Sequence, residues 1–310
     1  MNKFISRYFK VCYQTCMAIC LTAGLMTVSL SAVAAQKKSS LETEHNNDVI
    51  RWAGCGITKK AFMQELAEAY EKKTHVKVIL EGGGATRGIR DTVGLKIDMG
   101  GTCRMTLPEA DNSEMHASLY PVAWDALAVI SHKSNPINNF SMKQIRDIYT
   151  GKITNWKSLG GPDAPIHLYA RSGMISGVGY AIRQYVFQDS SKEFNTKYKV
   201  ASSGPLEKAI EKDPYAIGIT GVSSARKRNV KIQGFDGKVP SYENVKSGDY
   251  GLYRPLYLVT GPAPSKKVRE FLAFATSEEG RQVLRDNGTV PYQEGLHLMR
   301  NMLIYGFGMK

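Results

Sequence analysis

The chain has 310 residues, of which 43% are hydrophobic and 22% charged, a composition typical of a globular protein and not of a disordered one. The net charge of +13 at pH 7 favours anionic ligands or surfaces. Apart from Arg226-Lys227-Arg228, the basic residues are dispersed, and no nucleic-acid-binding motif accompanies them. We therefore expect no nucleic-acid partner.

Residues 1–34 have the pattern of a signal peptide. Lys3, Arg7 and Lys10 form a basic start, an apolar stretch follows, and Ala32-Val33-Ala34 matches a cleavage site. We expect cleavage after Ala34 and export, which would remove the three basic residues and leave the mature chain near +10 instead of +13. An uncleaved membrane anchor is the alternative, because the stretch is long enough to span a membrane.

Residues 35–47 are almost devoid of apolar side chains and predict a flexible tether. Three of the five cysteines lie in the leader, so the mature chain would keep Cys55 and Cys103. No metal-binding or haem-attachment spacing survives cleavage, so we expect no metal and no cofactor.

The first part of the globular region alternates strand and helix patterns. A short strand over 49–52, which ends at Gly54, leads to a helix that Thr58 can cap. A strand over 76–80 leads to a short helix that Thr86 can cap and that runs through Thr92. A third strand is expected over 97–99. This alternation predicts a parallel sheet with ligand-binding turns at the carboxyl ends of its strands.

The second part continues the α/β pattern. The apolar run 124–131 predicts a buried strand, and Ser141 begins a helix with a capping box. Pro255 places its own strand, 252–259, at an edge or a crossover. Further strands are expected over 166–169 and 216–220, and further helices over 176–187, 206–212, 266–275 and 277–285.

Four glycine-rich turns follow strand-like runs, and most of them lead into helices. They are residues 54–58, 81–88, 100–104 and 171–177. Free backbone N–H groups and a positive helix end converge on an anion in this geometry. The turns therefore predict capture of a small anionic solute.

The chain resembles the phosphate-binding proteins of ABC importers, within the type II periplasmic binding proteins. The resemblance covers nearly all of residues 48–292 and is carried by several segments together. They are Asp125–Ile130, Ser134–Pro136, Ile145–Trp156, Gly160-Gly161, Ile217-Gly218 and Arg254–Leu258.

This resemblance implies an α/β fold of two lobes with mixed sheets, helices on both faces and a hinge of two crossing strands. Lobe 1 would comprise residues 48–121 plus 250–300, and lobe 2 residues 122–249. Residues 301–310 would form a C-terminal tail that packs on the body of the protein or on a partner. The solute would be bound between the lobes, which close around it.

The resemblance also implies the ligand-binding residues. Thr58 matches a ligand hydroxyl, although it could serve only as a helix cap, and Arg171 matches a cationic clamp, although it could form a structural ion pair. Arg87 could reach the anion or face solvent. The remaining expected contacts are Ala85, Thr86, Cys103, Ser176 and Gly177.

Two positions depart from the family pattern. Cys103 stands where an aspartate accepts a hydrogen bond from protonated phosphate, and Val178 stands where a hydroxyl residue is usual. Neighbouring first and third strands would bring Cys55 close enough to Cys103 for a disulfide. Two buried thiols, or a redox or soft-metal site, are the other possibilities for this pair.

The sequence thus predicts an exported, periplasmic solute-binding protein, a monomer that captures phosphate or a related oxyanion for an ABC permease. The alternative is a divergent protein of this fold with a sensor, surface or redox-partner role that uses Cys55 and Cys103. Enzyme activity is not expected, because the histidines lack metal-ligand spacing and no catalytic motif occurs.

Overall fold

The computed structural model describes residues 49–306, and those from Ile50 onward belong to one compact unit. The predicted signal peptide (1–34), the tether (35–47) and the last four residues of the predicted tail lie outside the described residues. None of the described helices has both the length and the apolar character that a membrane span requires.

The strands form one long mixed sheet and one short two-stranded sheet. The long sheet has the order β2-β1-β3-β11-β4-β8-β6-β7, with β9 and β12 paired to β4. Its strands are β1 (Val49–Gly54), β2 (Lys77–Glu81), β3 (Met99–Thr102), β4 (Ser118–His132), β6 (His167–Arg171), β7 (Tyr198–Val200), β8 (Ala216–Gly221), β9 (Val230–Ile232), β11 (Tyr253–Thr260) and β12 (Val290–Pro291); β5 (Asn139–Phe140) pairs with β10 (Gly234–Phe235) in the short sheet.

Two long antiparallel strands, β4 and β11, join the two ends of the long sheet. The first part of β4 pairs with β11, whereas residues 127–131 pair with β8. Pro255 pairs with Trp124 in β4, and β11 pairs with β3 only over residues 257–259. Proline has no backbone N–H to donate. Pro255 is tolerated because at this position β11 is paired with β4 on one side and with none of the described strands on the other. The predicted crossover is confirmed.

The helices cover both faces of the sheet. They are α2 (Gly56–Thr58), α3 (Gln64–Thr74), α4 (Gly84–Val93), α5 (Met142–Tyr149), α6 (Gly177–Ile182), α7 (Ser203–Ile210), α8 (Val222–Ala225), α9 (Tyr242–Ser247), α10 (Lys266–Thr276), α11 (Glu278–Asp286) and α12 (Leu296–Tyr305). The π-helical turns η1 (Lys59–Met63) and η4 (Arg183–Phe187) continue α2 and α6, and 3₁₀ turns are η2 (Asn112–His116), η3 (Trp156–Leu159) and η5 (Tyr292–Gly295).

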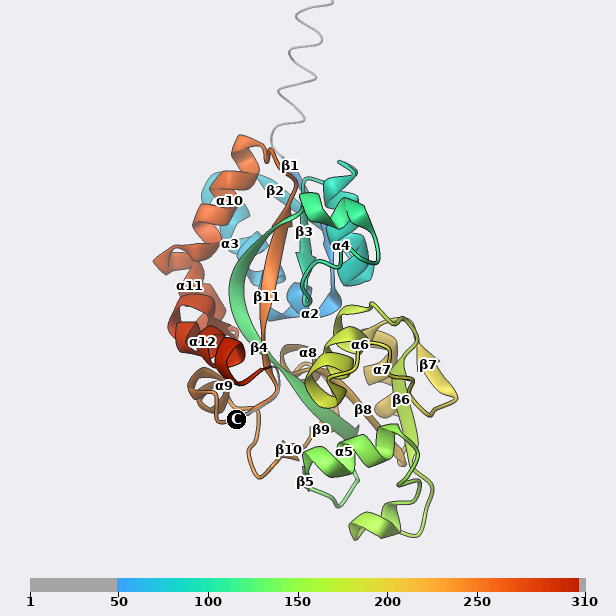
Figure 1. Ribbon diagram of the computed structural model, residues 1–310. Helices are drawn as coiled ribbons and strands as arrows, with labels where there is room; N and C mark the ends of the chain where they lie inside the picture. Colours follow the sequence, from blue (N-terminus) through green and yellow to red (C-terminus); the bar gives the residue numbers. More distant parts are fainter. Residues whose placement is uncertain (1–48, 307–310) are drawn as a thin grey trace, which may run out of the picture. The chain divides into compact units, whose positions relative to one another are not determined.

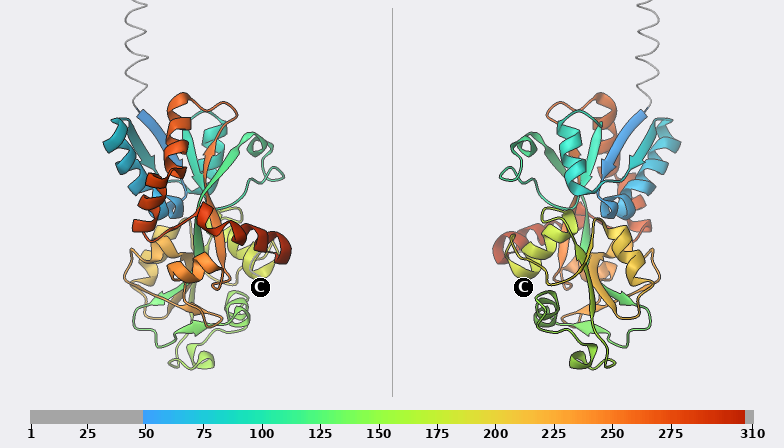
Figure 2. Two further views of the ribbon diagram at one scale, coloured as in Figure 1. Left: turned by 90° about the vertical axis from the view of Figure 1, so that its left-hand side faces the viewer. Right: turned by 90° about the vertical axis from the view of Figure 1, so that its right-hand side faces the viewer.

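The elements gather in two lobes that share β4 and β11. Strands β1 to β3 with α3, α4 and α10 lie at one end of these two strands, and β6 to β8 with α5 to α7 lie at the other (Figure 1). Both views in Figure 2 show the same division into blue-to-turquoise and green-to-yellow elements. This arrangement confirms the two-lobed type II fold, while the exact lobe boundaries remain a prediction.

Two helices begin earlier than the sequence suggested. Thr58 is not the cap of its helix, because the helix begins at Gly56 and Cys55 occupies the cap position. Thr86 likewise lies inside α4, which begins at Gly84. The positive φ angles of Gly83 (135°) and Gly84 (89°) let the chain turn directly into the helix. The predicted capping box at Ser141 is confirmed.

The boundaries of two strands also differ from those expected. Strand β3 begins at Met99 rather than residue 97, because Leu95 has a left-handed backbone (φ 57°) that delays the entry into the strand. Strand β4 extends to both sides of the apolar run 124–131, since its start pairs with β11. At the C-terminal end, α12 buries Leu298 and Met302 against the body of the protein and leaves Leu303 exposed.

Candidate functional site

A cleft of about 430 Å³ lies where the glycine turns of the two lobes face each other. Turns that follow β1, β2 and β3 line one wall, and turns that follow β6 and β7 line the other. The lining residues are Cys55, Gly56, Lys60, Gly82 to Ala85, Cys103, Arg171, Gly177, Val178, Ala201 to Gly204 and Ser224. The carboxyl ends of the strands therefore converge on one cavity, as expected for ligand sites in α/β proteins.

Four helices begin at this cleft without a side-chain cap. Within residues 49–306, no side chain accepts a hydrogen bond at the caps of α2, α4, α6 and α7. Elsewhere, Ser141, Ser241 and Ser277 cap α5, α9 and α11, whereas α8 and α10 also lack a side-chain cap among the described residues. Uncapped N–H groups and the positive ends of the helix dipoles favour a bound anion. The cleft thus has the polarity of an anion site.

Arg171 supplies a buried positive charge to the second wall. Its Nη1 donates to Ser203 Oγ (3.0 Å) and its Nη2 donates to Ala201 O (2.7 Å), while Nε has no partner among the described residues. Burial lowers the pKa of Arg171, and the two thiols opposite act to raise it. Because its partners are a hydroxyl and a carbonyl rather than a carboxylate, the guanidinium keeps a charge available to a ligand.

Cys55 and Cys103 lie side by side in the first wall as free thiols. Parallel pairing of Gly54 with Gly101 brings their turns together, and the two Sγ atoms are 2.9 Å apart. Both side chains are almost fully buried, and both line the cleft. The disulfide between them stays a prediction.

The thiol pair also faces charge from the crossing strands. Arg254 in β11 pairs with Asp125 in β4, with Nη2 and Oδ2 3.5 Å apart. Its Nη1 donates to the carbonyl of Cys103 (3.2 Å). Arg254 therefore ties the third glycine turn to the strands that join the lobes.

Three expected ligand hydroxyls do not line the cleft. Thr58 is fully buried and donates to Cys55 O (2.8 Å) within its own helix turn. Thr86 donates to Ile175 O (3.4 Å) and accepts from Arg104 (3.2 Å), so its hydroxyl bridges the two walls. The buried Oγ of Ser176 has no partner among the described residues and lies outside the lining.

The open question about Arg87 is answered by its contacts. Arg87 forms ion pairs with Glu81 (2.6 Å) and Asp91 (2.9 Å) and donates to Gly82 O (2.7 Å). Its guanidinium thus braces the second glycine turn from outside, and it does not belong to the cleft lining.

Sequence reasoning missed the turn after β7. Ala201 to Gly204 line the cleft and carry the start of α7, and Ser203 holds Arg171. The signal was present as a short β-rich run followed by Ser-Ser-Gly and a helical pattern, the same order as in most of the other turns. Lys60 and Ser224 were also missed, because a helix interior carries no comparable mark.

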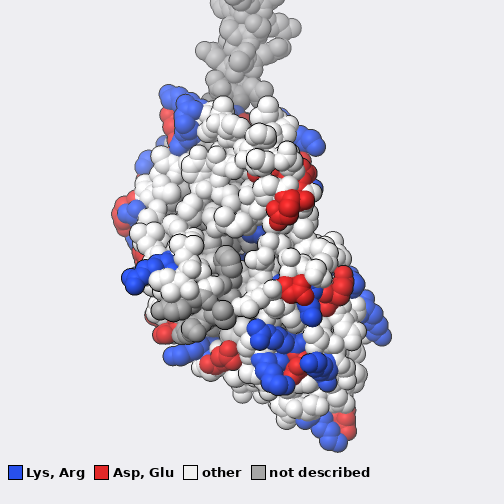
Figure 3. Space-filling model, viewed as in Figure 1, with Lys and Arg blue, Asp and Glu red and all other residues white. Residues whose placement is uncertain are grey.

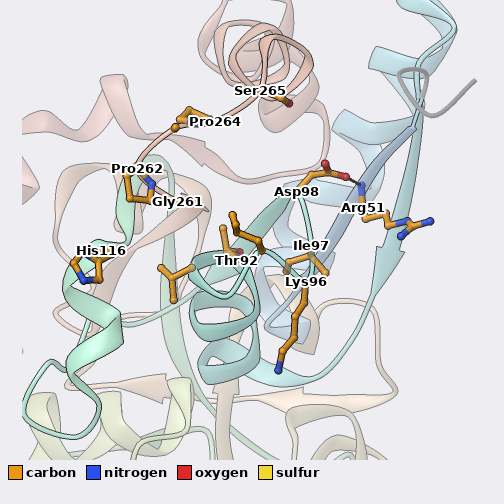
Figure 4. Close-up of a pocket in the computed structure, with 13 residues that line it drawn as sticks. Arg51, Thr92, Lys96, Ile97, Asp98, His116, Gly261, Pro262, Pro264 and Ser265 are labelled. Carbon is orange, nitrogen blue, oxygen red and sulfur yellow. Dashed lines mark hydrogen bonds between the residues drawn. The ribbon is translucent and has the colours of Figure 1, made fainter. Parts of the chain in front are cut away.

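A larger hollow of about 670 Å³ lies elsewhere on lobe 1 (Figure 4). It is lined by the end of α4, the residues 95–98 that precede β3, and the loop 261–265, together with Arg51 and His116. Asp98 in this hollow accepts from the backbone N–H of Arg51 (2.8 Å) and pairs with Lys267 (3.3 Å). Its carboxylate is therefore occupied, and the hollow lies at the amino ends of the strands, away from the glycine turns.

Comparison with known proteins agrees with this geometry. Residues 43–279 match the family model described as the PBP superfamily domain. The chain belongs to this family. The phosphate-binding protein PstS of Borreliella burgdorferi is 26% identical over 253 residues, which cover 78% of this chain and 90% of that protein.

Two solved structures of phosphate-binding transport proteins are also similar to this chain. A Clostridium perfringens protein, assigned as a phosphate ABC transporter substrate-binding protein and determined with bound phosphate, is 28% identical with a TM-score of 0.72; the match covers 78% of this chain and 99% of that one. An ABC-type phosphate transport receptor from Vibrio cholerae is 26% identical with a TM-score of 0.60 over the same shares. The resemblance to phosphate-binding proteins is confirmed, and the relatives named here are binding proteins rather than enzymes.

Proposed function

We propose that the protein is an exported solute-binding protein that captures phosphate or a related tetrahedral oxyanion and presents it to an ABC permease. The observation that carries this proposal is the convergence of four uncapped helix starts and Arg171 on one cleft. The relatives are named as phosphate-binding proteins, and one was determined with bound phosphate, which supports phosphate as the first ligand to test.

In this proposal, the backbone N–H groups at Ala85 and Gly177 donate to the anion from opposite walls. Arg171 forms charge-assisted hydrogen bonds through its unpartnered Nε, and Lys60 adds a second positive charge. Thr58, Thr86 and Ser176 do not contact the anion in this proposal, since they lie outside the cleft lining. They act by positioning the glycine turns to which they belong. Cys103 is a weak acceptor, so the site lacks the carboxylate that would select a protonated oxyanion.

The setting of this activity is part of the same proposal. A cleaved leader would place the protein in the periplasm. We also propose that it acts as a monomer, without enzymatic activity and without a nucleic-acid partner. On the face shown in Figure 3, Lys and Arg side chains are intermixed with Asp and Glu, which supports a solvated surface rather than a nucleic-acid-binding band.

Isothermal titration calorimetry with phosphate, sulfate, arsenate and molybdate tests the proposal. We expect heat of binding with phosphate, and Arg171→Ala should weaken that binding by about 10-fold to 100-fold, because a charged hydrogen bond contributes about 1.5–3 kcal/mol. Arg51→Ala is the matched control, since it removes one exposed guanidinium outside the cleft. Absence of binding with all four anions would exclude the proposed function.

A further inference from the structure

The thiol pair of the first wall has a geometry that the anion-binding role does not require. Cys55 and Cys103 lie 48 positions apart in the chain, yet their Sγ atoms are 2.9 Å apart. A disulfide bond is about 2.05 Å long, so the sulfurs need to approach by less than about 1 Å. Parallel pairing of β1 with β3 already holds both turns in register. The fold therefore presents a dithiol that is close to its oxidised geometry.

The pair is almost fully buried, but both cysteines form part of the wall of the cleft. Both cysteines line the cavity that also contains Arg171 and Gly177. A β-carbon at Gly177 would collide with Cys103 Sγ, so this sulfur lies directly against the start of α6 in the opposite wall. A sulfur in this place shares the positive helix end and the arginine with any bound anion.

The charges around the pair make its reduced form anionic. Burial acts to raise the pKa of Cys55, but the hydrogen bond with Cys103, the charge of Arg254 and nearby backbone N–H groups lower it to about 6. The hydrogen bond with Cys55, and then burial, raise the pKa of Cys103, while Arg254 and Arg171 oppose this rise. Above pH 6 the reduced pair thus carries one negative charge, which interacts electrostatically with Arg254 and with Arg171.

We propose that Cys55 and Cys103 form a redox-active dithiol, and that its oxidation to a disulfide increases the affinity of the cleft for its oxyanion. This inference rests on the proposed function. A thiolate repels an incoming anion and competes for Arg171, whereas a disulfide is uncharged. Oxidation removes that competing charge without removing a backbone donor.

The oxidation balances with a small disulfide as the oxidant. The Cys55 thiolate attacks one sulfur of that disulfide, forms a mixed disulfide and expels a thiolate. Cys103 then loses its proton to solvent and attacks the Cys55 sulfur, which forms the Cys55–Cys103 bond and expels the second thiolate. Two protein thiols are oxidised, and the small disulfide is reduced to two thiols.

The test compares the oxidised and reduced forms of the full mature chain. The protein is equilibrated with oxidised or reduced glutathione, transferred to glutathione-free buffer, and divided between thiol alkylation with mass measurement and calorimetry with phosphate. We expect alkylation of Cys55 and Cys103 only in the reduced form. At pH 8 the oxidised form should bind phosphate about 10-fold more tightly, which corresponds to the loss of one nearby charge.

A second pair of titrations at pH 5 isolates the charge effect. Phosphate ionises equally in both samples, so the ratio of the two affinities reports on the protein alone. Below the pKa of Cys55 the reduced pair is neutral, and the ratio should fall toward one. The double variant Cys55→Ser/Cys103→Ser should bind phosphate with the same affinity after either treatment, because it has neither the attacking nor the resolving thiol; circular dichroism checks that this variant folds.

The outcomes separate this inference from the proposed function. Phosphate binding of equal strength in both forms at pH 8, or tighter binding by the reduced form, overturns the inference and leaves the proposed function intact. Alkylation of both cysteines after treatment with oxidised glutathione also overturns it. If neither form binds any of the four anions, the proposed function fails and the inference falls with it.

Discussion

The two walls of the cleft use different chemistry for the same purpose. The first wall, from β1, β2 and β3, offers glycine turns and two cysteines, with Lys60 as its positive side chain in the lining. The second wall, from β6 and β7, offers Arg171 and the Ser202-Ser203 turn. The first wall therefore contributes mostly backbone N–H groups, which need close approach, and the second contributes a charge, which acts over a longer range.

The walls also differ in how they are held in place. Arg104 behind the first wall forms a buried ion pair with Glu114 and donates to Ile175 O of the second wall (3.0 Å). Arg171 in the second wall is held by neutral partners of its own lobe. The first wall thus depends on a charged network that reaches across the cleft, and this asymmetry can be tested by substitution.

The largest expected effect concerns the buried carboxylate behind the first wall. Glu114 is fully buried and accepts hydrogen bonds from Arg104, Arg90 and the N–H of Leu107. Glu114→Gln leaves Arg104 as an uncompensated buried charge and should reduce the free energy of unfolding by about 3 kcal/mol in urea titrations at pH 7. Glu278→Gln, at an exposed ion pair, is the control and should change it little.

The carboxylate of Glu114 also makes the free energy of unfolding depend on pH. Burial acts to raise the pKa of Glu114, but the hydrogen bonds from Arg104, Leu107 and Arg90 prevail and lower it below the ordinary 4.5. A lowered folded-state pKa stabilises the fold above the unfolded-state value, and this contribution is lost as the pH falls through the folded-state value. Urea titrations below pH 4.5 should therefore show a steeper loss of stability for the parent chain than for Glu114→Gln.

The next effect tests the close approach of the two walls. A β-carbon at Gly177 would collide with Cys103 Sγ and lie 3.1 Å from the Ala85 β-carbon, so Gly177→Ala forces the walls apart. The free-energy cost of overpacking of this kind is about 1–3 kcal/mol. If closure of the cleft bears this cost, phosphate affinity should fall by about 10-fold to 100-fold in calorimetry. Gly251→Ala is the control, because a β-carbon there meets no atom within 4 Å. Equal affinities would show that the walls need not touch.

The smallest effect concerns the hydroxyl that bridges the walls. Thr86→Val keeps the shape of the side chain but removes the hydrogen bonds to Ile175 O and Arg104. The net contribution of such a bond is about 0.5–1.5 kcal/mol, so phosphate affinity should fall by only about 2-fold to 10-fold. A loss as large as that of Arg171→Ala would instead indicate that Thr86 contacts the anion directly.

The order of strands and helices could be predicted from the sequence because each element carries a local signal. Apolar runs marked the strands, Ser141 and its capping box marked α5, and glycine turns marked the carboxyl ends of β1, β2, β3 and β6. The caps of α2 and α4 were each placed three residues too late, at Thr58 and Thr86 instead of Cys55 and Gly83, since threonine is a common cap. At α4 the positive φ angles of Gly83 and Gly84 were also not anticipated.

The direction in which side chains point was decided only by tertiary packing. Thr58 turns toward Cys55 O, and Arg87 turns toward Glu81 and Asp91, although both stand in turns that line the cleft. Ser203 became a partner of Arg171 because β7 lies beside β6, a pairing that no local pattern encodes. Local sequence determined where backbone N–H groups would be free, because that depends on neighbouring residues. Side-chain partners that lie far apart in the chain depend on which strands meet in the fold.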